Sequence, residues 1–87
     1  MVEKQVVVQN QVGLHARPVT FFIQKANEYK CSIWVEKDNR KVNAKSLLGV
    51  LSLGVARGME ITISAEGEDA QEAVDALEAL IESNFEE

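Results

Sequence analysis

The stretch Ser32-Ile33-Trp34-Val35-Glu36-Lys37-Asp38-Asn39-Arg40-Lys41-Val42-Asn43 reads as two short strands joined by a turn. Residues 32–36 are rich in β-branched and aromatic side chains, and residues 40–43 form a second, shorter run. Residues 37–39 lie between them and contain Asp and Asn, which are common in turns. We therefore predict a β-hairpin, which makes the two strands antiparallel neighbours.

Helices are predicted on both sides of this hairpin. Apolar residues recur at i, i+3, i+4 and i+7 over residues 16–27, which is the pattern of an amphipathic helix facing a core. Pro18 is compatible with that helix only in its first turn, where its missing N–H has no intrahelical partner. This helix should therefore begin near His15. After the hairpin, residues 46–53 are predicted to form a short helix that ends near a glycine.

The outer segments complete the pattern. Alternating apolar residues predict strands over residues 2–8 and 60–66, and residues 70–81 carry the apolar stripe of a final helix. Asp69, with Glu72 three residues on, resembles a capping box at the start of that helix. The order βαββαβα, with strands that have one apolar face, predicts an α+β sandwich of two layers.

The composition limits what kind of protein this is. A chain of 87 residues with 46% hydrophobic residues can bury one compact core, so we expect residues 1–87 to form a single domain. The N-terminus lacks the basic and apolar regions of a secretory signal, and no apolar run approaches the roughly 18 residues of a membrane span. A soluble, cytoplasmic protein is expected.

The counts of special residues exclude further classes. A single Cys31 cannot form an internal disulfide, and one cysteine with one histidine cannot assemble a four-ligand zinc site. We therefore expect no metal and no cofactor. The net charge of −5 argues against direct nucleic-acid binding, which needs a basic stripe. The few basic residues must then matter by their location.

The only histidine of the chain lies in Gly13-Leu14-His15-Ala16-Arg17-Pro18, at a predicted helix start. The backbone N–H groups of Ala16 and Arg17 lack intrahelical acceptors there, and the positive end of the helix dipole favours a bound phosphate. The same dipole disfavours protonation, so a neutral, nucleophilic imidazole is expected. We interpret His15 as a phosphoryl acceptor and donor and Arg17, with its bidentate guanidinium, as the group that steadies the phosphoryl oxygens. The alternative is that His15 is an ordinary surface or cap residue.

The second feature is the helix predicted over residues 46–53. Its apolar side chains point nearly all round the helix axis, so some of them cannot reach the core, and an exposed apolar patch is a candidate docking surface. The docking candidates are Leu47, Leu48 and Leu51. The alternative is that a loop or the C-terminal tail covers them. Ser46 is most simply an N-cap, but a phosphate there would add about −1.5 to −2 charges beside the leucines without disturbing the helix.

These two segments resemble a known family. Residues 13–18 resemble the phosphorylation signature of HPr, the histidine phosphocarrier of the bacterial phosphoenolpyruvate-dependent sugar phosphotransferase system (PTS). Lys45-Ser46-Leu47-Leu48-Gly49 resembles the regulatory-serine signature of the same family, and the resemblance covers essentially the entire chain. It implies an open-faced β-sandwich whose antiparallel strands have the order 1-4-2-3.

The resemblance also implies a function. His15 would accept phosphate at its Nδ1 atom from phosphorylated enzyme I and donate it to the IIA domains of sugar permeases, so the protein would be a carrier and not an enzyme. In relatives from low-GC Gram-positive bacteria, the serine matching Ser46 is phosphorylated by HPr kinase/phosphorylase, and the product joins the regulator CcpA in carbon catabolite repression.

Three departures from the family pattern stand out. Val12 replaces a small polar residue that many relatives carry near the active histidine. Leu48 and Leu51 replace methionines that are common in the docking patch, which keeps the patch apolar but makes it stiffer.

Residues 36–46 look closer to Crh, a regulatory paralogue of HPr that in bacilli typically has glutamine at the histidine position. The presence of His15 favours a working carrier. Two alternatives stay open: a Crh-like regulator that acts through Ser46, and a plain interaction module in which His15 is idle.

Overall fold

The structure, a computed structural model, describes residues 1–9 and 16–83. For residues 16 and 17 it describes the backbone but not the side chains. These residues form four strands and three helices in the order predicted from the sequence. The strands are β1 (Val2–Val7), β2 (Ser32–Lys37), β3 (Arg40–Asn43) and β4 (Glu60–Glu66), and the helices are α1 (Ala16–Asn27), α2 (Leu47–Ser52) and α3 (Ala70–Glu82).

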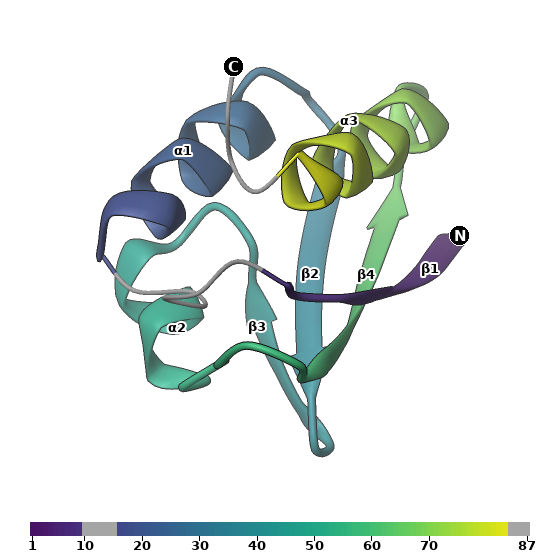
Figure 1. The fold of residues 1–87 in the computed structure, drawn as a ribbon. Coiled ribbons are helices and arrows are strands. Elements are labelled where there is room, and N and C mark those ends of the chain that lie inside the picture. Colours follow the sequence, from purple (N-terminus) through teal and green to yellow (C-terminus); the bar gives the residue numbers. More distant parts are fainter. Residues whose placement is uncertain (10–15, 84–87) are drawn as a thin grey trace.

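The strands pair into one antiparallel sheet with the order β1-β4-β2-β3. Helices α1 and α3 pack against each other, and α3 contacts β1, β4 and β2. The shorter α2 packs between α1 and β3 (Figure 1). The α+β fold with strand order 1-4-2-3 is therefore confirmed.

The core lies between the sheet and the helices. Alternate residues of β4, Ile61 and Ile63, are buried, and the register places them beside Val6 of β1 and Val35 of β2 respectively. Buried residues recur on α3 at helical spacing, as the sequence indicated: Ala70, Ala73, Val74, Leu77, Leu80 and Ile81. Burying one face of each element fixes the register of the sheet, since a slip by one residue would expose the apolar set.

The hairpin between β2 and β3 has a tighter turn than predicted. Lys37 belongs to β2 and pairs with Arg40, so the turn holds two residues and not three. Asp38 and Asn39 have φ values of 51° and 67°. Both central residues of a type I′ turn need positive φ, and Asp and Asn reach this region at lower cost than other residues with a side chain.

The predicted capping box at the start of α3 is wrong. Asp69 holds the N-cap position, but its side chain makes no cap hydrogen bond. Its carboxylate instead accepts hydrogen bonds from the backbone N–H groups of Lys30 at 2.8 Å and Cys31 at 3.0 Å. The loop between α1 and β2 therefore satisfies this carboxylate, and the contact ties that loop to the beginning of α3.

Candidate functional site

The segment that carries His15 lies outside the described residues, but both of its ends are placed. On one side, the N–H of Val8 donates to the carbonyl of Met59 at 2.9 Å, and the N–H of Gly58 donates to the carbonyl of Val8 at 2.6 Å. On the other side, α1 begins at Ala16, directly after the histidine. This boundary is consistent with the prediction that His15 sits at a helix start. The predictions about the imidazole of His15 and about Val12 concern residues outside the described ones.

The first turn of α1 has the features that an anion requires from the backbone. The first turn itself contains no acidic residue, so none of its own side chains offsets the positive end of the helix dipole. Pro18 lies in this turn, as the sequence predicted, and is buried. The N–H groups of Ala16 and Arg17 belong to the set of four that lack intrahelical acceptors. The side chain of Arg17 is not among the described parts of the chain. Its role in steadying the phosphoryl oxygens therefore stays a prediction.

Ser46 is the N-cap of α2, as predicted. Its backbone is extended, with φ −104° and ψ 116°, and its Oγ accepts a hydrogen bond from the N–H of Gly49 at 3.1 Å. A Cβ atom placed on Gly49 would lie 3.2 Å from that Oγ, which is tighter than an ordinary contact. The glycine therefore leaves room around the Ser46 hydroxyl.

The short helix α2 has two kinds of apolar residue. Val50 and, just after the helix, Leu53 are buried in the core, whereas Leu47 is 46% exposed and Leu48 is 78% exposed. Leu51 is half-buried and packs against the core. The prediction that some leucines cannot reach the core is confirmed, and Leu48 is uncovered in the part of the chain that the structure describes. We call Leu47, Leu48 and Leu51 the leucine patch.

Two cations at the β2–β3 hairpin hold the C-terminal end of α2. Arg40 donates from its guanidinium to the carbonyl of Ser52 at 2.9 Å and to its Oγ at 3.1 Å. Lys37 donates from Nζ to the carbonyl of Leu53 at 3.0 Å. These carbonyls carry the negative end of the helix dipole and lack intrahelical donors, so cations satisfy them well. The sequence carries no local signal for either contact, because the partners are 12 and 16 residues apart.

The other end of α2 is held by Lys45. Its Nζ donates to the carbonyls of Tyr29 at 2.7 Å and Cys31 at 2.9 Å. The residue before Ser46 therefore anchors to the loop after α1, and the leucine patch sits on a helix that is fixed at both ends.

Residues of the same loop also lower the pKa of Asp69. The backbone N–H of Lys30, which donates to the Asp69 carboxylate, and then the neighbouring Cys31 thiol hold the pKa of Asp69 below its usual range. Burial, followed by the neighbouring carboxylate of Asp69, raises the pKa of the Cys31 thiol, so this cysteine is not set up as a nucleophile. The cluster is structural.

Residues 1–9 and 16–83 contain no group of three or more His, Cys, Asp or Glu side chains that could hold a metal ion. None of the helices α1 to α3 is long and apolar enough to cross a membrane.

Comparison with known proteins identifies the family. A family model described as "PTS HPr component phosphorylation site" matches residues 2–83. The chain belongs to the HPr family. Members of the HPr family are phosphocarriers and not classical enzymes. Ser46, Leu47 and Leu48 lie in the segment where the sequence resembles the regulatory signature of the HPr family.

Relatives of both branches of the HPr family are similar to this chain. The HPr-like protein Crh of Halalkalibacterium halodurans is 52% identical over 94% of this chain and 98% of its own, and that of Bacillus subtilis is 46% identical over 94% and 96%. A solved structure of HPr from Thermoanaerobacter tengcongensis is 53% identical, with a TM-score of 0.96 over 100% of this chain and 99% of that one. HPr from Bacillus anthracis is 48% identical, with a TM-score of 0.89 over 92% and 95% of the two chains.

Proposed function

We propose that this chain carries a phosphoryl group on His15 in the PTS. The observation that supports this most strongly is the match of the HPr phosphorylation-site model to residues 2–83, in a chain whose histidine directly precedes the first residue of α1. The same proposal treats residues 1–87 as one HPr-type domain in the cytoplasm.

The proposed chemistry is a reversible transfer. A nitrogen–phosphorus bond forms at Nδ1 of His15 as the bond between phosphorus and phosphorylated enzyme I breaks, and the bond at His15 breaks again when an IIA domain accepts the group. The guanidinium of Arg17 and the free N–H groups of Ala16 and Arg17 balance the charge of the phosphoryl oxygens. No metal or cofactor takes part in this proposal.

The leucine patch is the proposed docking surface for the partners. Leu48, exposed over 78% of its surface, is the kind of residue that partner proteins bury. Because α2 is held at both ends, by Lys45 and by Arg40, the patch is preorganised, and little conformational entropy is lost when it binds.

Ser46 is the proposed regulatory site. Its hydroxyl caps α2 beside the leucine patch, so phosphorylation by HPr kinase/phosphorylase would add negative charge at the docking surface while the helix end tolerates it. The phosphorylated form would then join CcpA in carbon catabolite repression.

The experiment for the main proposal is phosphorylation by phosphoenolpyruvate in the presence of enzyme I. The chain should be labelled and His15→Ala should not be, while the two proteins melt at similar temperatures. Label on His15→Ala would contradict the assignment.

A second candidate is a Crh-like regulator that acts mainly through Ser46. The supporting observation is that the two curated relatives described above, at 52% and 46% identity, are both Crh. This candidate predicts ATP-dependent labelling of Ser46 by the kinase together with no labelling by enzyme I.

A further inference from the structure

One peptide group in the loop after α1 lies between two opposite charges. Its carbonyl, that of Tyr29, accepts a hydrogen bond from Nζ of Lys45 at 2.7 Å. Its N–H, that of Lys30, donates to the carboxylate of Asp69 at 2.8 Å. Among the described residues no ion pair joins the ammonium and the carboxylate directly, so the peptide group is the link between the segment before α2 and the start of α3.

A second hydrogen bond on each side strengthens this link. Nζ of Lys45 also donates to the carbonyl of Cys31 at 2.9 Å, and the N–H of Cys31 donates to the other carboxylate oxygen of Asp69 at 3.0 Å. Hydrogen bonds to charged groups are stronger than neutral ones, and a peptide group that one charge polarises binds the other more tightly. The loss of either charge should therefore weaken the contacts of the other. We call Lys45, Asp69 and the loop residues 29–31 between them the charged bridge.

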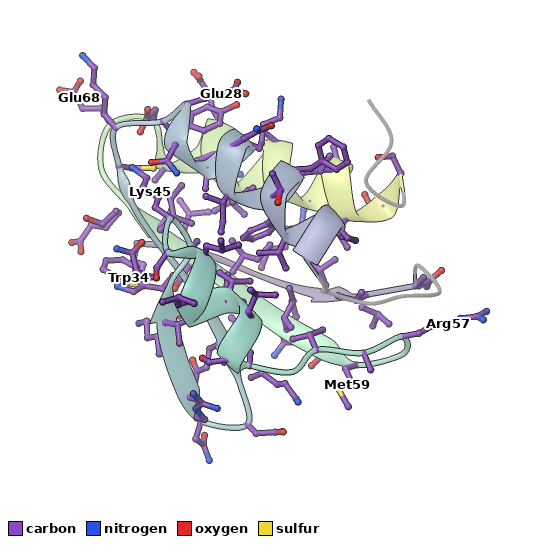
Figure 2. The ribbon with its side chains drawn as sticks, turned by 90° about the vertical axis from the view of Figure 1, so that its left-hand side faces the viewer. Glu28, Trp34, Lys45, Arg57, Met59 and Glu68 are labelled. Atoms are coloured by element: carbon purple, nitrogen blue, oxygen red, sulfur yellow. The ribbon has the colours of Figure 1, made fainter. Side chains whose placement is uncertain are left out.

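The charged bridge ends beside the proposed regulatory serine. Lys45 directly precedes Ser46, the N-cap of α2, and Figure 2 shows Lys45 between α2 and the end of the molecule that carries Glu68, the residue before Asp69. The N–H of Lys45 donates to Oδ1 of Asn43 at 2.8 Å, and the N–H of Ser46 donates to the carbonyl of Asn43 at 3.0 Å. The backbone that carries the Ser46 hydroxyl is thus held by the end of β3 on one side and by the charged bridge on the other.

We infer that Asp69 is a positioning residue for the proposed phosphorylation of Ser46 and that it acts through Lys45. This inference rests on the proposed regulatory role of Ser46. In that reaction a bond forms between Oγ and the γ-phosphorus of ATP as the bond to ADP breaks, and the hydroxyl proton passes to a base of the kinase. A misplacement of about 1 Å can cost about a hundredfold in such a rate. The charged bridge keeps the hydroxyl in one place before the kinase binds.

The first test measures amide hydrogen exchange in α2. Asp69→Asn keeps the size of the side chain but sets an NH₂ group against one of the two N–H donors of the loop. The amides of Gly49 and Val50, which donate to the Oγ and the carbonyl of Ser46, should then exchange roughly three- to tenfold faster. Asp69 has no hydrogen bond to α2 among the described residues, so this effect has to pass through the charged bridge.

Two control variants accompany this measurement. Glu68→Gln removes the exposed carboxylate next to Asp69 and tests whether charge in this region matters by itself. Ile81→Val deletes a buried methyl group from α3 and tests whether a loss of overall stability is enough. Both variants should leave the exchange of the α2 amides at the parent rate, because a short helix opens locally.

The second test measures the phosphorylation of Ser46 by ATP and the kinase. Asp69→Asn should lower kcat roughly three- to tenfold and change KM less than twofold, because the position of the hydroxyl is altered and the docking surface is not. Lys45→Met should lower kcat as well. The double variant should be no slower than the slower single variant, as expected for two residues that act as one unit. Glu68→Gln and Ile81→Val should keep the parent kcat.

Four results would overturn the inference. They are unchanged exchange of the α2 amides in Asp69→Asn, an unchanged kcat for that variant, an equal loss of kcat in either control, and single effects that multiply in the double variant. If the kinase labels the unmodified chain and Asp69→Asn equally fast, only the role of Asp69 fails. If the kinase does not label the unmodified chain, the proposed role of Ser46 and this inference fail together.

Discussion

The guanidinium of Arg40, the first residue of β3, bridges to Ser52, the last residue of α2, and donates to both its carbonyl and its Oγ. This relationship fixes the helix that presents the leucine patch, since it satisfies a carbonyl that has no donor within the helix. A six-residue helix has few hydrogen bonds of its own, so contacts at its ends decide how often it opens.

Arg40→Ala should therefore loosen α2 more than the rest of the protein. Losing these exposed hydrogen bonds should cost about 0.5–1.5 kcal/mol, which corresponds to roughly two- to tenfold faster hydrogen exchange of the α2 amides. The amides of α3 serve as an internal control and should exchange at the parent rate. Equal acceleration in both helices would show that Arg40 stabilises the fold globally and not this helix.

Leu48→Asp should separate docking from stability. Because Leu48 is 78% exposed, the new carboxylate stays in water and the melting temperature should change little, while binding to enzyme I should weaken. The control is Leu53→Asp, which buries an unpaired carboxylate in the core and should largely unfold the domain. Unchanged binding by Leu48→Asp would remove the leucine patch from the docking surface.

Ser46 gives a prediction with two variants. Ser46→Ala should lose about 0.5–2 kcal/mol of stability through the lost N-cap, and Ser46→Asp should retain the cap. Ser46→Asp should nevertheless slow transfer to His15, because we expect enzyme I to approach with groups that complement the basic Arg17, and new negative charge beside the leucine patch opposes that approach. The deficit should shrink at high salt. If Ser46→Asp transfers as fast as the parent and the kinase still labels Ser46→Ala, Ser46 is only a cap.

Asp69 predicts a specific dependence of stability on pH. Its folded-state pKa is lowered by the N–H of Lys30 and the thiol of Cys31, so the stability it adds is present above the ordinary carboxyl pKa of about 3.9 and is lost as the pH falls through the lowered value. Urea unfolding should show Asp69→Asn to be less stable than the parent at pH 7, with a gap that narrows in acid. The matched change Asp75→Asn, on the exposed face of α3, corrects for net charge. A gap that stays constant with pH would contradict this role.

The order of the elements could be predicted because each one carries a local signal. The apolar spacing of α1 and α3, the alternation in β4 and the turn residues Asp38 and Asn39 all report on neighbours a few positions away. The position of Ser46 as a cap was predictable for the same reason.

The errors and omissions involve contacts between distant residues. Asp69 matches a local capping pattern, yet its partners lie 38 and 39 residues away, where the packing of α3 brings the loop after α1 within reach. Arg40 and Lys37 gave no signal for the same reason.

The most direct test of the central claim is a two-step relay. The chain is labelled with phosphoenolpyruvate and catalytic enzyme I, freed of enzyme I, and then mixed with an IIA domain, and the label on each protein is followed with time. The account predicts that the chain acquires an acid-labile label and that this label then moves to the IIA domain. An unlabelled chain, or a label that is acid-stable or stays on the chain, would contradict it.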